Sequence, residues 1–346
     1  MKGACCFSSI IIKMNVTIKD VAKAAGVSVA TVSRVLNNSA TVSSAATEQV
    51  NQAIKELGYS PNFLGRNLRK CETNVILAII PSTEHTFYSE IVKGMQHAAS
   101  EQGYDILLST SNSMLSIENR MLNMLYNRTV DAAILLGTQL DAATLNELND
   151  KYHIALCCER VEGANVLTVT VDDEGGAHAA VKNFISMGHN KIAMISTDGK
   201  ALTSHDREKG YLKALSENGI TIKDEYIFRG SYDYTDGAKA FDYFMKLSDP
   251  PTAIFCISDL LAAGAIKRAL TTGYKIGEDI SVCGFDNIQL SSLYTPGITT
   301  IEQPCFEIGR TVVSELIYNI SHSKRHNKRY VLSYKLIQRS SVGKNK

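Results

Sequence analysis

The sequence lacks the features that mark disulfide-bonded and membrane proteins. Its eight cysteines include no C-x-x-C pair, and four of them stand as two adjacent pairs, which favours reduced thiols in a reducing cytoplasm. The apolar run of residues 5–12 is too short for a membrane span or a convincing signal peptide. No other segment of the chain is apolar enough to enter a bilayer.

Signatures of catalysis are missing as well. The sequence has no G-x-x-x-x-G-K-[ST] phosphate loop, no G-x-G-x-x-G opening a helix after a strand, no G-x-S-x-G elbow and no H-E-x-x-H helix. Its histidines are scattered, and we interpret His85, His189 and His205 as hydrogen-bonded loop residues and not as metal ligands. We therefore expect neither an enzyme nor a bound metal or cofactor.

A strong asymmetry of charge is present instead. Residues 1–72 hold nine Lys and Arg against four Asp and Glu, a net charge of +5. The other 274 residues hold 27 basic and 31 acidic residues, a net charge of −4. A basic head on an acidic body is typical of a chain that binds a polyanion at one end.

The length of 346 residues predicts two or three domains. Residues 1–13 precede the first helical pattern, and we expect them to be a non-native extension, with Met14 as the natural start. Residues 14–60 then form a helical head, residues 61–73 a linker and residues 74–342 a larger body.

The head has the pattern of a helix-turn-helix. Thr17 and Asp20 form a capping box that opens one helix, and Gly26 supplies a tight turn before Ser28 caps the next. A plain helical bundle that binds no DNA has the same pattern. The outward face of the second helix favours DNA, because it carries an arginine and small hydroxyl groups that suit base edges and phosphates.

The string T-I-K-D-V-A-K-A-A-G-V-S-V-A-T-V-S-R-V-L-N, residues 17–37, resembles the DNA-binding head of the lactose-repressor family. The resemblance implies that Val29 and Ala30 read bases and that Arg34 contacts a base. It also implies that residues 61–73 are a hinge helix that folds on DNA, although an ordinary solvated linker fits them too. The predicted DNA-binding residues are Thr17, Ser28, Val29, Ala30, Thr31, Ser33, Arg34, Asn37 and, in the hinge, Leu68.

In the body, apolar strand-like runs alternate with amphipathic helices, which predicts doubly wound parallel sheets in two α/β lobes. The strings M-G-H-N-K-I-A-M-I and S-V-C-G-F-D-N-I extend the resemblance to the family and to periplasmic binding proteins. By that resemblance, lobe one spans about 74–171 and 304–330, and lobe two about 172–303 and 331–342. Ligands of such folds bind in the cleft beyond the carboxyl ends of the strands.

Loops at these strand ends carry polar and aromatic residues. Taken singly, each fits a cap or a surface residue, as Asp259 fits a helix cap. Taken together, they suit a polar, ring-shaped ligand, and the resemblance places several of them around the effector. The predicted effector-binding residues are Phe87, Tyr88, Glu159, Arg207, Tyr232, Ser258, Asp286 and Gln303.

These patterns predict a sequence-specific transcriptional regulator, a repressor, that is controlled by a small molecule. One head reads only a half-site, so we expect a homodimer on a nearly palindromic operator. Strings such as G-R-N-L-R-K resemble the nucleoside-responsive (cytidine) repressor branch, whereas Ser258 stands where sugar-responsive members often have Asn. A nucleoside and a sugar or sugar derivative both stay open as the effector, as do its sense of action, the operator sequence, and dimer against tetramer.

Overall fold

The computed structural model describes residues 16–36, 42–59, 72–198, 201–322 and 325–345. The chain divides into two compact units, Met1–Glu72 and Thr73–Lys346, and each is considered by itself. Four predictions lie outside the described residues: the extension of residues 1–13, Asn37, most of the hinge, and Leu68 within it.

The head is built from helices α1 (Ile18–Ala24), α2 (Val29–Leu36) and α3 (Ser44–Leu57). The capping box is present, since the Thr17 amide donates to Asp20 Oδ2 at 2.8 Å. Gly26 has φ +66°, the left-handed turn that glycine adopts without strain. The helices pack around a small core in which Val21, Val32 and Val50 are fully buried.

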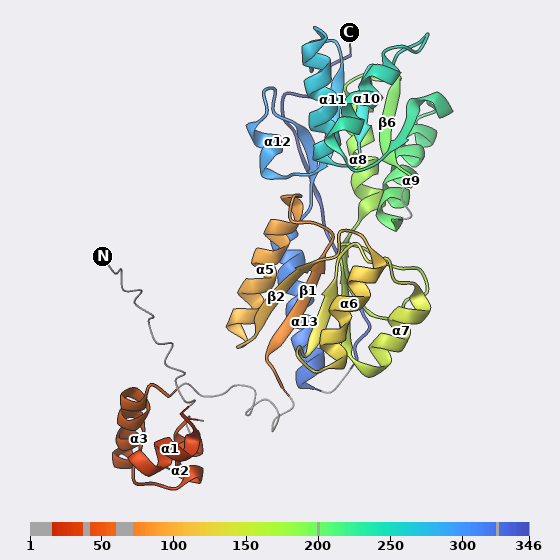
Figure 1. Ribbon diagram of the computed structural model, residues 1–346. Helices are drawn as coiled ribbons and strands as arrows, with labels where there is room; N and C mark the ends of the chain where they lie inside the picture. Colours follow the sequence, from red (N-terminus) through yellow and green to blue (C-terminus); the bar gives the residue numbers. More distant parts are fainter. Residues whose placement is uncertain (1–15, 37–41, 60–71, 199–200, 323–324, 346) are drawn as a thin grey trace, which may run out of the picture. The chain divides into compact units, whose positions relative to one another are not determined.

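Lobe one of the core contains a parallel sheet with strand order β11-β5-β4-β3-β1-β2 (Figure 1). Helices α5 and α13 pack on one face and helices α6 and α7 on the other. The strands are β1 (Val75–Ile80), β2 (Asp105–Thr110), β3 (Ala132–Leu135), β4 (His153–Cys157), β5 (Leu167–Val171) and β11 (Arg329–Leu332). The helices are α5 (Phe87–Glu101), α6 (Leu115–Tyr126), α7 (Ala142–Lys151) and α13 (Cys305–Ser321).

Helices α5 and α13 approach so closely that glycine is required where they meet. A Cβ at Gly94 would lie 2.0 Å from the Phe306 carbonyl oxygen, and one at Gly309 would lie 2.0 Å from the Ile91 carbonyl oxygen. No side chain fits either position without moving a helix backbone.

Lobe two repeats the plan, with strand order β12-β10-β9-β8-β6-β7. Strand β12 runs antiparallel to β10, so the prediction of parallel sheets holds for all of these strands except this short one. The strands are β6 (Ile192–Thr197), β7 (Ile227–Gly230), β8 (Ala253–Cys256), β9 (Ser281–Asp286), β10 (Thr299–Glu302) and β12 (Lys335–Ile337). The helices are α8 (Asp173–Ser186), α9 (Leu202–Glu217), α10 (Tyr234–Phe244), α11 (Asp259–Thr271) and α12 (Gln289–Leu293), with a 3-10 turn at Asp224–Tyr226.

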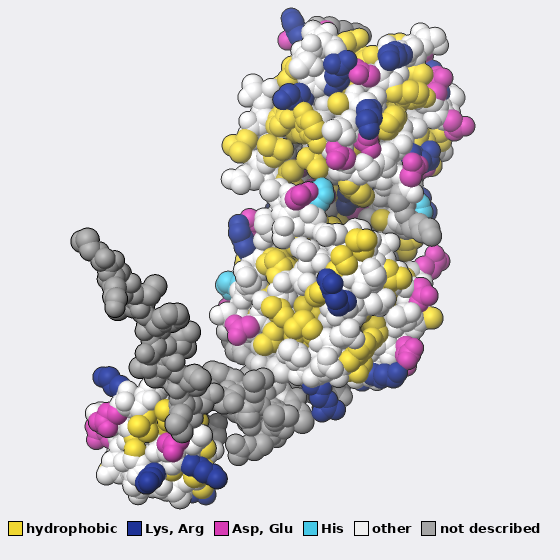
Figure 2. Space-filling model, viewed as in Figure 1, with side chains coloured by type: hydrophobic (Ala, Val, Ile, Leu, Met, Phe, Trp, Pro, Cys, Tyr) yellow, Lys and Arg dark blue, Asp and Glu magenta, His cyan; other side chains and the backbone are white. Residues whose placement is uncertain are grey.

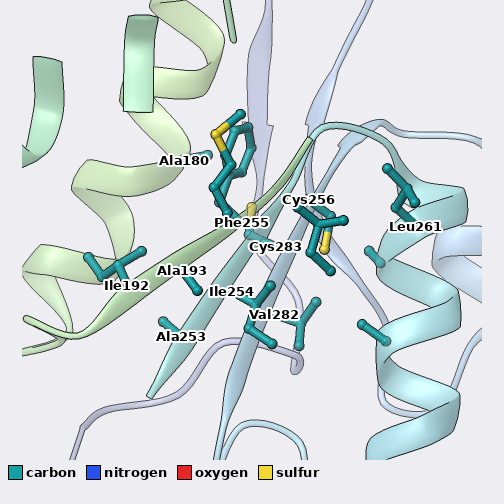
Figure 3. Close-up of a cluster of buried hydrophobic side chains, with 14 of the residues drawn as sticks. Ala180, Ile192, Ala193, Ala253, Ile254, Phe255, Cys256, Leu261, Val282 and Cys283 are labelled. Carbon is teal, nitrogen blue, oxygen red and sulfur yellow. The ribbon is translucent and has the colours of Figure 1, made fainter. Parts of the chain in front are cut away.

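The core of lobe two lies on both faces of its sheet. Figure 3 shows Ala180 of α8 and Leu261 of α11 on opposite sides of the strand that carries Ile254 and Phe255, all of them fully buried. The chain passes between the lobes after β5, after β10 and after β11. The lobes are therefore joined by short strand-to-helix and strand-to-strand connections, which suit a hinge. No described helix is both long and apolar enough to span a membrane.

Candidate functional site

The first candidate site is the exposed face of α2 in the head. Val32 and Val35 point into the head's core, which turns Ser28, Val29, Ala30 and Arg34 to solvent and leaves Thr31 and Ser33 half-buried. Val29 is 41% exposed, which leaves its side chain accessible to a partner. Helix α2 thus presents one contiguous face of small, hydroxyl and basic groups.

Two of the predicted DNA-binding hydroxyls also shape the helix ends. Ser28 Oγ accepts the Thr31 amide at 3.1 Å and lies 2.9 Å from Thr31 Oγ1, so it caps the start of α2. Thr17 Oγ1 donates to Asp20 Oδ2 at 2.7 Å. Arg34, by contrast, makes no recorded ion pair with any described residue, and its guanidinium stays available.

The second candidate site lies where the carboxyl ends of both sheets face each other. Arg207, on α9, is its central cation and is 6% exposed. Its Nε donates to Asp173 Oδ1 at 2.8 Å, its Nη1 donates to the Ile257 carbonyl, and its guanidinium carbon lies 3.7 Å from the centre of the Phe285 ring. Burial disfavours the charge of Arg207, but the two nearby carboxylates outweigh burial and raise its pKa above the ordinary value.

Asp286 ends β9 beside this arginine. Its Oδ1 lies 3.6 Å from Arg207 Nη1 and accepts Gln303 Nε2 at 2.7 Å. Burial raises the pKa of Asp286 to about 7, although Arg207 and Gln303 pull it down. The backbone of Asp286 has φ +108°, a conformation that non-glycine residues rarely adopt. The structure therefore brings three predicted residues, Arg207, Asp286 and Gln303, into one polar cluster.

Aromatic side chains form the opposite wall. Phe87 and Tyr88 begin α5, with ring centroids 5.3 Å apart in an edge-to-face arrangement. Burial raises the pKa of Tyr88, and the nearby acids Cys158, Glu159, Tyr232 and Asp286 raise it further. Groups from both lobes thus surround the Tyr88 hydroxyl.

Glu159 belongs to a carboxyl pair in lobe one. Its Oε1 accepts the Thr138 amide at 2.5 Å, while the Thr138 hydroxyl donates to Glu118. Burial raises the pKa of Glu159 to about 8, and the charge of Glu118 adds to the effect. At neutral pH this carboxyl is therefore largely protonated and able to donate a hydrogen bond.

Tyr232 and Ser258 lie at the edge of this arrangement. The Tyr232 hydroxyl is 2.9 Å from Ser204 Oγ, and the side chain is 36% exposed. Ser258 is the N-cap of α11, where its Oγ accepts the Leu261 amide at 3.3 Å. The prediction that Asp259 caps this helix is wrong, because the carboxylate of Asp259 turns inward to accept Thr300 Oγ1 at 2.6 Å and the Ile288 amide at 2.9 Å.

The predicted set omitted groups that the fold makes central. Asp173 is the buried partner of Arg207, but a carboxylate in the first turn of a helix is common for electrostatic reasons and gave no signal. Arg160 of lobe one donates through Nη2 to both carboxylate oxygens of Asp206 in lobe two, at 2.8 and 2.6 Å. This ion pair connects the two lobes. It could not be predicted from the sequence, because the two residues are 46 positions apart.

A helix-turn-helix head joined to a two-lobed core that holds a buried polar cluster defines a ligand-controlled DNA-binding regulator. Comparison with known families agrees: residues 17–62 match "Bacterial regulatory proteins, lacI family" and residues 73–340 match "Periplasmic binding proteins and sugar binding domain of LacI family". The chain belongs to the LacI family and is a transcriptional regulator, not an enzyme, as predicted.

Individual relatives cover almost the whole chain. It is 36% identical over 302 residues to the HTH-type transcriptional repressor CytR of Escherichia coli strain K12, covering 87% of this chain and 89% of the relative. It is 35% identical to the NTD biosynthesis operon regulator NtdR of Bacillus subtilis strain 168, covering 94% of this chain and 99% of that relative. The lac repressor dimer bound to operator and the anti-inducer ONPF superposes with a TM-score of 0.86 at 26% identity, covering 95% and 99% of the two chains.

Proposed function

We propose that this regulator is a cytoplasmic repressor that binds a nearly palindromic operator as a homodimer and is controlled by a small molecule between its two lobes. The observation that carries the proposal is the presence in one chain of an exposed Arg34 on α2, without an ion pair to any described residue, and of a buried polar cluster around Arg207. The first group suits a base edge, and the second suits a ligand with hydroxyl or amide groups.

In the head, α2 enters the major groove. Val29, Ala30 and Arg34 meet base edges, while the hydroxyls of Ser28, Thr31 and Ser33 reach phosphates. Thr17 stabilises the start of α1 and is assigned to the DNA-binding set by resemblance to the family. Asn37 and Leu68 complete the set by resemblance to the family.

In the core, the effector lies between aromatic and polar walls. Phe87, Tyr88 and Tyr232 pack against its ring, and the Arg207, Asp286 and Gln303 cluster binds its polar edge. Glu159, protonated at neutral pH, donates a hydrogen bond to it. Ser258 acts by fixing the start of α11.

Either a nucleoside or a sugar fits this chemistry, since aromatic rings stack on a base as well as on a sugar face. One structural relative, the complex of the transcriptional regulator CelR with cellobiose, superposes with a TM-score of 0.73 at 29% identity. A thermal-shift screen against nucleosides, purines, sugars and sugar phosphates decides, because a ligand of the native state raises its melting temperature. Failure of every class to raise it would contradict control by such an effector.

The homodimer forms through one face of the core. Leu107 and Leu108 of β2 are 39% and 40% exposed, and Leu290 and Leu293 at α12 are 37% and 70% exposed. Figure 2 shows apolar side chains gathered on this face in both lobes. A twofold axis through such a surface buries it and doubles the number of heads. Sedimentation of the full chain tests the stoichiometry.

Ligand and DNA are coupled through the angle between the lobes. The Arg160–Asp206 ion pair holds the lobes together at the cleft, and the connections after β5, β10 and β11 bend. An effector that bridges Tyr88 and Arg207 stabilises one lobe angle over another. That change is transmitted to the start of β1, where the linker from the head joins the core.

A further inference from the structure

Lobe one ends in an unusually basic segment. Residues 322–329 read H-S-K-R-H-N-K-R, with four Lys and Arg, two His and no acid. Arg325, Lys328 and Arg329 are exposed, and no ion pair joins any of them to a described residue. Their recorded contacts leave the charges free, since Arg325 donates to the Asp150 carbonyl and Lys328 lies 4.5 Å from the Tyr330 ring centre.

Two residues of the segment, His326 and Asn327, are held in place on the lobe. Asn319, which is 4% exposed, donates to the His326 carbonyl at 3.4 Å and accepts the His326 amide at 3.2 Å. Asn149 Nδ2 donates to Asn327 Oδ1 at 2.9 Å. The cations therefore stand on an ordered scaffold, and binding a partner costs less conformational entropy than ordering a free loop.

The basic segment lies at the same end of lobe one as the linker to the head. Asp131 accepts the Thr73 amide at 2.8 Å and the Asn74 amide at 2.7 Å, which fixes the point where the linker joins. The imidazole of His153 interacts electrostatically with both Arg325 and Asp131. Burial and the charge of Arg325 lower the pKa of His153, whereas Asp131 raises it. Figure 2 shows Lys and Arg side chains gathered at this end of the core.

Four carboxylates lie at this end of the lobe, and three of them contact other groups. Asp131 binds the backbone of residues 73–74, and Glu147 pairs with Lys151 at 2.7 Å. Burial raises the pKa of Tyr330 to about 12, and the interaction of its hydroxyl with Glu315 adds to this rise. Asp150 adds one exposed acid beside Arg325. None of these four carboxylates forms an ion pair with Arg325, Lys328 or Arg329.

We infer that Arg325, Lys328 and Arg329 form a second DNA contact, which binds phosphates flanking the site that the head reads. The inference rests on the proposed DNA binding by α2. A duplex held by the head is tethered to Thr73 through residues 60–72, a reach of at most about 50 Å. The tether keeps phosphates at high local concentration near the basic segment, and duplex DNA carries a charge about every 1.7 Å. An acidic protein partner has no such tether.

The contact adds affinity without reading sequence, because these side chains meet phosphates and not base edges. Its signature is therefore a salt dependence that grows with the length of flanking DNA. The full-length protein first selects its site from a random duplex library. The selected site is then made in two forms, one without flanks and one extended by a helical turn on each side, and binding is followed by fluorescence anisotropy across a range of NaCl concentrations.

The test variant is Arg325→Ala/Lys328→Ala/Arg329→Ala, and the matched control removes three exposed lysines of lobe two, Lys182→Ala/Lys246→Ala/Lys344→Ala. On the extended duplex, the slope of log affinity against log salt falls by about 0.9 for each contact that the test variant loses, whereas the control keeps the wild-type slope. On the duplex without flanks, the three proteins agree. A second variant, Lys328→Gln/Arg329→Gln, keeps the Arg325 bond to Asp150 and guards against a folding defect.

An unchanged slope for both test variants on the extended duplex, with specific binding intact, overturns this inference alone and points to an acidic protein as the partner. If the wild type selects no site from the library, the proposed function fails and the inference falls with it.

Discussion

Arg34 of the head and Arg207 of the core are both placed to bind a polar partner, but their surroundings are opposite. Arg34 is exposed and forms no ion pair within the described part of the chain, whereas Arg207 is buried between Asp173 and Asp286 and over the Phe285 ring. An exposed side chain that binds DNA contributes little to the stability of its own domain. Among the described residues, Arg207 binds only groups of lobe two, so it also stabilises that lobe, and removing it should affect both folding and binding.

The largest expected effect is on stability. Arg207→Ala leaves Asp173 and Asp286 buried without their cation and lowers the free energy of unfolding of the core by about 3–5 kcal/mol. Arg34→Ala is the matched control and changes it by no more than about 0.5 kcal/mol. Urea unfolding of the full chain measures both. Equal stabilities of the two variants would contradict a structural role for Arg207.

For DNA affinity we expect the opposite order, with a larger loss in Arg34→Ala than in Arg207→Ala. Arg34→Ala weakens binding to the selected site by about 5- to 150-fold, because a guanidinium lost from a base edge costs roughly 1–3 kcal/mol. Lys23→Ala, an exposed lysine of the same head, serves as the control and should change affinity much less. Affinities of Arg34→Ala within threefold of wild type would show that α2 is not the reading helix.

Glu159 extends the comparison to pH, because the fold of the core raises the pKa of this carboxyl. Its pKa of about 8 in the folded protein exceeds the value of about 4.3 of an exposed glutamate. The folded state therefore binds the extra proton between these values, and this contribution to stability is complete below the lower pKa and is lost as pH rises through about 8. Glu159→Gln should flatten the fall in melting temperature between pH 5 and pH 8 relative to wild type. A parallel fall in both proteins would contradict a shifted Glu159.

The smallest effect is expected at the ion pair between the lobes. Arg160→Ala costs about 1 kcal/mol of stability or less, because both partners are partly exposed, but it frees the lobes to separate. Effector affinity should therefore fall a few-fold while operator affinity without effector stays near wild type. Lys209→Ala, which removes a longer contact to the same Asp206, is the control. An unchanged effector affinity in Arg160→Ala would show that this ion pair has no role in lobe closure.

The same contrast explains what the sequence could predict. The head is encoded locally: the cap at Thr17, the turn at Gly26 and the face of α2 all lie within about twenty consecutive residues, and the structure has the capping box and the turn as expected. The α/β rhythm of the core is also local, so its sheets could be predicted. Strand β12 departs because its direction depends on a partner far along the chain.

The cleft is encoded by residues that are distant in sequence, and prediction was weaker there. Arg207, Asp286 and Gln303 were expected and lie together, whereas their partner Asp173 was missed because it resembles an ordinary helix-start acid. Ser258 and not Asp259 caps α11, because the carboxylate of Asp259 accepts hydrogen bonds from Thr300 Oγ1 and the Ile288 amide in the interior of the lobe. Only the packed structure supplies that information.

One measurement tests the central claim, which is that the cleft of the core controls DNA binding by the head. Operator affinity is measured with and without the ligand that the thermal-shift screen identifies. The account predicts that a saturating ligand changes operator affinity by about 5- to 150-fold, and that operator changes ligand affinity by the same factor. A ligand that binds the core and leaves operator affinity unchanged would contradict it.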